Sequence, residues 1–189
     1  MTIEWRPAEG ADRPLLQRFE CTSPAPRRPG RRPAAHPKPY EKGVQSAIRT
    51  LSVPVGGRDG TCLVGFDDGT LVAVALWCRM DDVDFPIIKL RLLAVARTAR
   101  GKGGAVAREC LDEVLARIAA ELTEGEVATV YGLVDYRNTA SQRLLTDMQF
   151  ELQADAPTED PNLTMWAIDI AVDARKQALA STEPSPDFR

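Results

Sequence analysis

The segment that most restricts the fold is TCLVGFDDGTLVAVALW, residues 61–77, which consists of two apolar runs joined by an Asp-Gly pair. Both central positions of a tight hairpin turn favour a positive φ, and Asp68 and Gly69 are residue types that tolerate it. Apolar runs of this length are typical of strands. The segment therefore predicts two antiparallel strands joined by a short turn.

Shorter patterns before this hairpin predict one strand and two helices. IEWRP at 3–7 suits a short strand, and DRPLLQRF at 12–19 suits a short helix with Asp12 as its N-cap. YEKGVQSAIRTL at 40–51 places apolar residues at helical spacing and predicts an amphipathic helix. Between the helices, residues 21–39 are rich in proline and arginine and predict a long loop. That loop is either a flexible basic connector or a lid that contacts substrate.

After the hairpin, the strand predicted at 87–95 alternates charged and apolar residues. Alternation in a strand directs each set of side chains to one face of the sheet. The basic set is Lys89 and Arg91, and the apolar set is Ile88, Leu90 and Leu92. One face of this strand is therefore predicted to be at least partly polar.

The remaining sequence alternates helices with strands. A broad apolar stripe from Gly104 onward predicts a long helix, and EVATVYGLV at 126–134 a mostly buried strand. A shorter helix follows at 138–148, and strands at 150–154 and 163–170 close the domain. The order is β-α-α-β-β-β-α-β-α-β-β, which predicts an α+β fold with a mixed, mostly antiparallel sheet and helices on both faces.

Composition limits the domain count, location and partners. The 189 residues suit one domain at 1–170 followed by a polar tail at 171–189. A net charge of -3 and a pI near 5.3 argue against general nucleic-acid binding, which needs a basic excess. No apolar stretch approaches the length of about eighteen residues that a membrane span requires, so a cytoplasmic location is expected.

Cysteine and histidine usage argues against a metal site. The four cysteines are far apart in the sequence and form no C-x-x-C pair, and the only histidine is His36 in the loop at 21–39. Zinc sites usually need closely spaced thiol and imidazole ligands. We therefore predict no metal, and reduced thiols that are mostly buried, at Cys21, Cys62, Cys78 and Cys110.

A glycine-rich stretch, ARTARGKGGAVA at 96–107, lies between the strand at 87–95 and the long helix. Glycine allows positive φ and close approach of a ligand to the backbone, and successive N–H groups at a helix start favour an anion. A diphosphate would fit such a site. The stretch lacks the spacing of a Walker loop or of a dinucleotide fingerprint. It is either an anion-binding turn or a plain connection.

The same stretch contains R-x-x-G-x-A, with Arg100, Gly103 and Ala105, and resembles the acetyl-CoA binding motif of the GNAT superfamily of N-acetyltransferases. NTASQRLLTDMQFEL, beginning at Asn138, resembles a second pattern of that family, a helix with N-x-x-A/S at its start. The two motifs stand in the family's order and on the expected elements. The resemblance covers about residues 3–170 and implies the GNAT fold.

The resemblance implies roles for particular residues in binding acetyl-CoA. The diphosphate would be held, chiefly by backbone N–H groups, at Arg100, Gly101, Lys102, Gly103, Gly104 and Ala105. Leu93 and Val95 would pair their main chain with the pantetheine arm and place an N–H near the acetyl carbonyl. Asn138 and Ser141 would contact the cofactor from the other side. Asn138 also suits a simple helix cap, and the two roles can coexist.

The catalytic groups are less well defined by the resemblance. In the family, the general acid is often a tyrosine on the helix that follows the asparagine. This chain has Leu145 at that position, and it has Gln149 where the family usually has glycine. Tyr136 and Tyr131 are candidate proton donors, although each also suits a packed or surface tyrosine. Asp84, with its neighbours Asp81 and Asp82, is a candidate base in what is equally a solvated acidic loop. Lys89 and Arg91 would either favour an acceptor bearing a carboxylate or phosphate, or pair with these aspartates.

The resemblance predicts an acetyl-CoA-dependent N-acetyltransferase that transfers the acetyl group by direct attack of a primary amine in a ternary complex. The acceptor would be a small molecule, a peptide or a charged tRNA, and the family often forms homodimers. Loss of the tyrosine allows an alternative: a catalytically inactive CoA-binding module in regulation or assembly. A third hypothesis is that the basic loop at 27–38 docks an acidic partner or nucleic acid.

Overall fold

A computed structural model describes residues 2–23, 38–55, 60–80, 85–101, 104–154, 156 and 158–171. Its elements follow the predicted order: β1 (Glu4–Pro7), α1 (Arg13–Arg18), α2 (Pro39–Thr50), β2 (Thr61–Asp67), β3 (Thr70–Met80), β4 (Ile87–Val95), α3 (Ala105–Glu121), β5 (Val127–Asp135), α4 (Thr139–Asp147), β6 (Glu151–Gln153) and β7 (Leu163–Ala171). The loop predicted at 21–39 is described only at its two ends, and of the predicted tail only Ala171 is described, as the last residue of β7.

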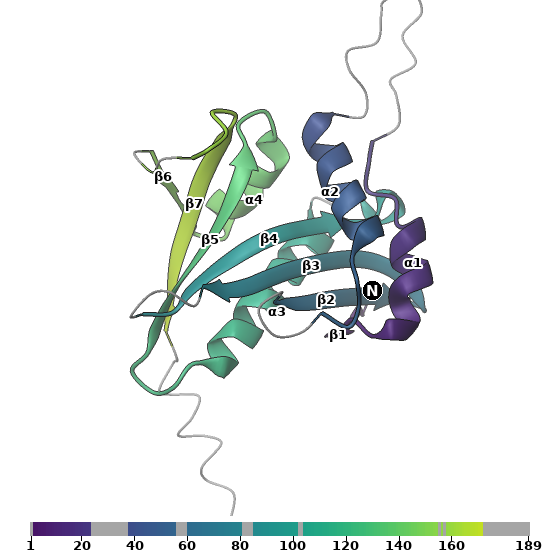
Figure 1. Cartoon of the computed structure of the whole chain (residues 1–189), viewed down its shortest axis with the longest axis horizontal. Helices are drawn as coiled ribbons and strands as arrows, with labels where there is room; N and C mark the ends of the chain where they lie inside the picture. The colour runs from purple at the N-terminus through teal and green to yellow at the C-terminus, as the bar shows by residue number, and fades with distance from the viewer. Residues whose placement is uncertain are drawn as a thin grey trace, which may run out of the picture.

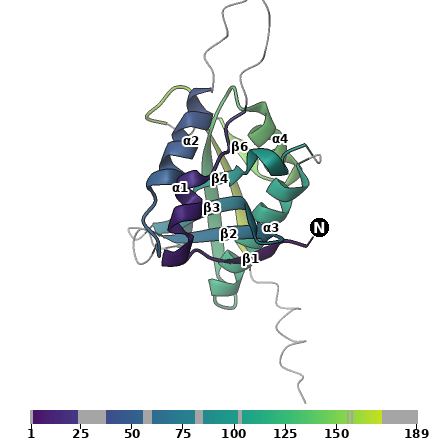
Figure 2. The ribbon, with the colours of Figure 1, turned by 90° about the vertical axis from the view of Figure 1, so that its right-hand side faces the viewer.

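One seven-stranded sheet, in the order β1-β2-β3-β4-β5-β7-β6, forms the middle layer of the molecule. Neighbouring strands are antiparallel except β4 and β5, which are parallel. The helices lie on both sides of the sheet, α1 and α2 on one face and α3 and α4 on the other (Figures 1 and 2). The predicted fold class is confirmed. The predicted hairpin is also confirmed, because β2 pairs with β3 around Asp68 and Gly69, both at positive φ.

Each face of the sheet has its own hydrophobic core. On one face, Ile48 of α2 and Leu16 of α1 are almost completely buried against β2 and β3. On the other face, α3 buries Leu111 and Val114 against β3, β4 and β7. Burial of this kind is the main favourable contribution to folding. The sheet is thus fixed between two helical layers, and α3 contacts strands on both sides of the β4–β5 pair.

The alternation predicted for β4 is wrong at Leu92. Leu90 pairs with Trp77 and Leu92 pairs with Leu76, so Arg91 is one extra residue on β4, a β-bulge. A bulge shifts the side chains that follow it to the opposite faces of the sheet. Leu92 is therefore buried on the α1–α2 side, whereas Ile88 and Leu90 pack on the α3 side.

Asp12 also differs from its prediction. It occupies the N-cap position of α1, but its side chain makes no capping hydrogen bond to that helix. Its carboxylate accepts two hydrogen bonds from Arg6, each 2.7 Å long, and one of 2.8 Å from the Glu9 N–H. Arg6, above all, holds the pKa of the buried Asp12 carboxyl below its usual range, against the effect of burial. The side chain joins β1 to the turn before α1 instead of capping the helix.

The cysteines are free thiols, as predicted, and three of the four are buried. Burial raises the pKa of Cys62 to about 12 and also raises that of Cys110. Such thiols are unreactive because the thiolate is the reactive form. Within the described residues, no helix has both the length and the apolar character needed to cross a membrane.

Helix α4 ends in a Schellman motif whose left-handed residue is Gln149. The Phe150 N–H donates to the Leu145 carbonyl (2.9 Å), the Gln149 N–H donates to the Thr146 carbonyl (3.0 Å), and Gln149 has a φ of 64°. Glycine is the usual residue at this position because a side chain is strained at positive φ. The glutamine is therefore under backbone strain that a glycine at this position would not have.

Gln149→Gly is expected to stabilise the protein by about 1 kcal/mol, because it removes the strain of the left-handed conformation. The change in the free energy of unfolding can be measured by urea denaturation. Gln149→Ala is the matched control, since alanine loses the same polar group but keeps the strain. Equal stability of the glycine and alanine variants would contradict the prediction.

Candidate functional site

The central feature of the site is the early separation of β4 and β5. These parallel strands pair over only four positions, from Ile87↔Thr129 to Leu90↔Gly132. Beyond these, β4 stays paired with β3 as far as Val95, and β5 stays paired with β7 as far as Asp135. In Figure 1 the strands diverge like the arms of a V, with α2 beside one arm and α4 beside the other. Two strand edges therefore face each other inside the sheet.

A cleft of about 560 Å³ opens where the strands separate. Its size is in the range of small-molecule sites. Its walls come from the first turns of α2, from β4 at 90–93, from β5 at 132–135 and from α4. Leu93, Asn138 and Ser141, which the sequence places at a cofactor site, all line it. The other proposed cofactor residues that the structure describes are not in this lining: Val95 ends β4, and Arg100, Gly101, Gly104 and Ala105 lie between β4 and the first turn of α3.

The turn before α3 is open where a ligand would approach. Gly101 and Gly104 have φ values of 99° and 80°, and a Cβ placed on either would meet no atom of the described residues within 4 Å. Gly104 is the N-cap of α3, whose first N–H groups have no intrahelical partners, and a helix start carries partial positive charge. The described part of this turn, which includes Ala105, therefore fits an anionic group. Lys102 and Gly103 lie outside the described residues.

The Arg100 side chain is bound by other segments of the chain. Its guanidinium hydrogen-bonds the Cys21 carbonyl and the Ser23 hydroxyl, and forms an ion pair with Glu41 of α2. The side chain therefore contacts the N-terminal end of the predicted loop and the start of α2. Arg100 could contact a diphosphate, as predicted, through its backbone N–H. Its guanidinium could do so only after breaking the bonds to Cys21, Ser23 and Glu41.

Asn138 caps α4. Its side-chain oxygen accepts a hydrogen bond of 3.3 Å from the Ser141 N–H, and its amide donates to the Ser141 hydroxyl at 2.7 Å. The capping role that the sequence allowed is thus present. Because both residues also line the cleft, the cap presents polar groups to any molecule bound there.

Asn138→Ala is expected to cost about 1 kcal/mol of stability, because it leaves the start of α4 without its side-chain acceptor. Asn138→Asp should retain most of the stability, since a carboxylate caps equally well. Chemical denaturation of the three proteins measures both effects. An alanine variant as stable as the wild type would show that the cap contributes little.

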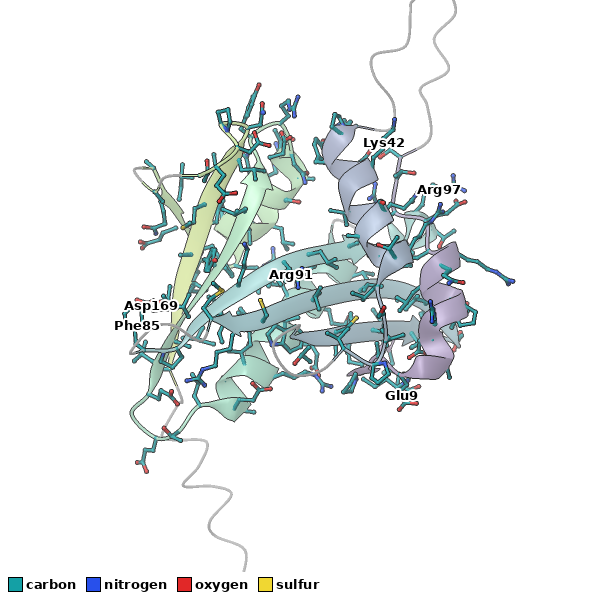
Figure 3. All side chains as sticks on the ribbon, in the orientation of Figure 1. Glu9, Lys42, Phe85, Arg91, Arg97 and Asp169 are labelled. Atoms are coloured by element: carbon teal, nitrogen blue, oxygen red, sulfur yellow. The ribbon has the colours of Figure 1, made fainter. Side chains whose placement is uncertain are left out.

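Charged groups at the rim of the cleft are already paired. Arg137 donates to both oxygens of the buried Asp135 carboxylate, at 2.8 and 2.6 Å, and thereby lowers the pKa of Asp135. Asp160 accepts hydrogen bonds from the backbone and side-chain nitrogens of Asn162, and the backbone bond is the main reason that its pKa is lowered. Both carboxyls are therefore stable anions and weak bases. Arg91 also lines the cleft (Figure 3 shows it over β4).

Leu145 lies in the cleft wall at 5% exposure. It packs with the core on the α3 side, and its side chain has no proton to donate. Where the resembled family often has a tyrosine, this chain therefore presents an aliphatic side chain to the cleft.

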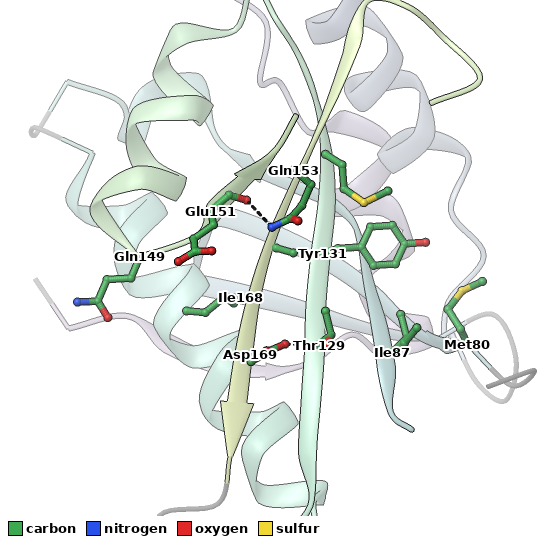
Figure 4. Close-up of a pocket in the computed structure, with 11 residues that line it drawn as sticks. Met80, Ile87, Thr129, Tyr131, Gln149, Glu151, Gln153, Ile168 and Asp169 are labelled. Atoms are coloured by element: carbon green, nitrogen blue, oxygen red, sulfur yellow. Dashed lines mark hydrogen bonds between the residues drawn. The ribbon is translucent and has the colours of Figure 1, made fainter. Parts of the chain in front are cut away.

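Tyr131 lies in a different hollow. That hollow, of about 730 Å³, is formed by β5, β6 and β7 together with Met80 and Ile87 (Figure 4). Burial raises the pKa of Tyr131, and the Lys89 ammonium lies 6.0 Å from the centre of its ring. Neither Tyr131 nor Lys89 is among the described residues that line the cleft between β4 and β5.

The other catalytic candidates are placed differently. Tyr136 follows β5, is 54% exposed, and has the Arg137 guanidinium 5.4 Å from its ring centre. It adjoins the cleft rim but is absent from the lining among the described residues. Asp84, with Asp81 and Asp82, lies outside the described residues.

The sequence analysis missed Tyr40, which lines the cleft from the first turn of α2. The available signal was its position one turn before Val44, on the apolar side of the predicted helix. That spacing places both residues on the face that α2 turns toward the sheet.

The chain is similar in fold to solved acetyltransferase structures. An acetyltransferase of the GNAT family from Streptococcus pneumoniae matches with a TM-score of 0.58 at 15% identity, over 90% of this chain and 100% of its own. The ribosomal-protein-S18-alanine N-acetyltransferase of Escherichia coli matches with a TM-score of 0.59 at 17% identity, over 92% and 97%. The yncA protein of Salmonella typhimurium, solved with its cofactor acetyl-CoA, matches with a TM-score of 0.52 at 15% identity, over 99% of both chains.

No protein-family model and no curated protein sequence matches the chain. At the identities found among the solved structures, the similarity concerns the fold, and activity has to be argued from the site itself.

Proposed function

Because the chain has the GNAT fold, we propose that the cleft between β4 and β5 is the active site of an acetyl-CoA-dependent N-acetyltransferase. The acceptor is a primary amine that attacks directly while both substrates are bound. The observation that carries this proposal is the separation of the two strands after Leu90 and Gly132, which opens the cleft inside the sheet. The cleft and the open glycine turn lie at the two ends of the same segment of chain, from the middle of β4 to the start of α3.

Acetyl-CoA, when bound, would supply the acetyl group as a thioester. The backbone N–H groups around Gly101, Gly104 and Ala105 would hold its diphosphate at the positive end of α3. Leu93 and Val95 would offer main-chain groups along the exposed edge of β4. Leu145 would exclude water from the reacting groups, and holding amine and thioester together would provide much of the rate enhancement.

Tyr40 is the proton donor that we favour. The chain has three tyrosines, and among the described residues that line the cleft Tyr40 is the only one. Tyr40→Phe is expected to lower kcat about tenfold, a small effect for general acid catalysis because a thiolate is a fair leaving group. Tyr131→Phe is the control and should leave kcat unchanged, and Tyr136→Phe tests the residue next to the rim. A fall in kcat in Tyr136→Phe alone would identify Tyr136, and not Tyr40, as the proton donor.

The direct test measures binding and turnover separately. Calorimetry with acetyl-CoA tests the binding site, and thiol release with a panel of small amines, peptides and aminoacyl-tRNA tests transfer and identifies the acceptor class. Binding together with turnover on one amine class would support the proposal. Absence of binding would overturn it.

A second candidate function rests on Leu145. With an aliphatic residue where the family often has a tyrosine, the chain could bind CoA without transferring acetyl groups. Acetyl-CoA binding without turnover on any amine of the panel would favour this regulatory or assembly role.

A further inference from the structure

The Arg100 side chain contacts three separate segments of the chain. Its Nε donates to the Val95 carbonyl at 3.4 Å, one terminal nitrogen donates to the Ser23 hydroxyl at 3.1 Å, and the other donates to the Cys21 carbonyl. The nitrogen that reaches Ser23 also lies 3.5 Å from Glu41. One guanidinium therefore connects the end of β4, the segment at 21–23 and the start of α2.

Glu41 completes the connection. Its side chain is only 9% exposed, accepts a hydrogen bond of 2.6 Å from the Ser23 hydroxyl and another of 3.3 Å from the Lys38 N–H. Burial would raise the pKa of Glu41, but Ser23, Lys38 and Arg100 together hold it below its usual range, so the carboxylate stays charged beside the guanidinium.

The start of α2 is also a wall of the cleft. Pro39 and Tyr40, which immediately precede Glu41, line the cleft. Arg100 belongs to the glycine-rich turn, and its contact with Glu41 thus joins that turn to the wall of the cleft that α2 forms. A guanidinium has five N–H groups, and these contacts use four of them, which leaves too few for bidentate binding of a phosphate.

We propose that Arg100 is a positioning residue: it ties the glycine turn to the α2 wall of the cleft through Glu41 and is not a ligand of the diphosphate. This inference rests on the proposed function for its kinetic consequence. The tie itself is a property of the folded chain and can be tested without any ligand.

The experiment compares Arg100→Met with Glu41→Met, each of which removes one end of the tie: methionine matches the length of glutamate and replaces only the apolar part of the arginine side chain. Arg97→Met is the matched charge control: Arg97 (labelled in Figure 3) belongs to the same turn but pairs with Glu20, 3.2 Å away. Arg100→Lys and Glu41→Gln are the conservative variants. Amide hydrogen exchange of residues 38–44, the Kd for acetyl-CoA and the KM for the acceptor are measured for each.

If Arg100 and Glu41 act together, Arg100→Met and Glu41→Met should change amide exchange and the acceptor KM to the same extent. Exchange at 38–44 should become about fivefold faster in both and stay unchanged in Arg97→Met. The acceptor KM should rise about fivefold in both with little change in kcat, the double variant should be no worse than either single one, and the conservative variants should recover part of the loss.

A diphosphate ligand would behave differently. Arg100→Met would then weaken acetyl-CoA binding tenfold or more, about the value of a charged hydrogen bond, while Glu41→Met would not. That result, or unchanged exchange in Arg100→Met, would overturn the proposal. If Arg100→Met fails to fold, Arg100→Lys and Glu41→Met provide the comparison. A wild type that binds no acetyl-CoA would overturn the proposed function alone, because the exchange measurement does not depend on it.

Discussion

Gly132→Leu is expected to abolish acetyl transfer, with kcat/KM falling about 1,000-fold, or about 4 kcal/mol in transition-state stabilisation. Gly132 forms the last residue pair between β5 and β4 and lines the cleft at the point where the strands separate. A leucine there would fill the space in which the proposed function places the reacting groups. Thiol release from acetyl-CoA measures the loss, and thermal unfolding shows that the fold is retained.

Gly132→Ala is the matched control. A Cβ at this position would lie 3.7 Å from the Leu90 carbonyl oxygen and 3.8 Å from the Leu90 Cβ, which are ordinary van der Waals distances. The alanine variant should therefore keep its activity within about threefold, the scale of a minor packing change. A folded leucine variant with wild-type activity would place the acetyl site elsewhere in the molecule.

Gly65→Ala is expected to destabilise the fold by about 3 kcal/mol, because the new methyl group overlaps an anchored indole ring. A Cβ at Gly65 would lie within 2.3 to 2.7 Å of three ring carbons of Trp5. The ring has little freedom to move, since its Nε1 donates to Glu109 at 3.0 Å and the Trp5 carbonyl accepts from Arg117 at 3.2 Å. Urea denaturation measures the change.

Two comparisons test whether the overlap with the Trp5 ring causes the loss of stability in Gly65→Ala. Gly65→Ala in a Trp5→Leu background should cost much less than in the wild type, so the two substitutions should be clearly non-additive. Gly43→Ala is the same chemical change in the middle of α2, where the part of the chain that the structure describes has no atom within 4 Å of the new Cβ, and it should stabilise by about 0.5–1 kcal/mol. Additive effects of Gly65→Ala and Trp5→Leu would exclude the clash as the cause.

The parts of the fold that the sequence predicted are those with local signals. Asp68 and Gly69 define a turn through their own backbone preferences, and the β2–β3 pairing follows from it. Asn138 is a local signal too, because a cap bonds to N–H groups two or three positions along the chain. The α+β order could therefore be obtained by joining local predictions.

Features that depend on distant segments could not be predicted in this way. The bulge at Arg91 is defined by how β4 pairs with β3, and nothing in the composition of β4 marks it. Apart from Val95, the partners of Arg100 lie 59 to 79 residues away in the chain, so its motif indicated a phosphate contact rather than these bonds. Tyr40 likewise reaches the cleft only because α2 packs over the sheet.

Only four residue pairs join β4 to β5, and we expect this strand boundary to act as a hinge. The strands β1 to β4 on one side and β5 to β7 on the other are each continuously paired, so the sheet should bend most easily along this boundary, where α3 contacts strands of both parts. A molecule lodged between the two exposed edges would resist that bending. Occupancy of the cleft and stiffness of the whole molecule should therefore rise together, and a ligand-induced increase in Tm would report binding even before any acceptor is known.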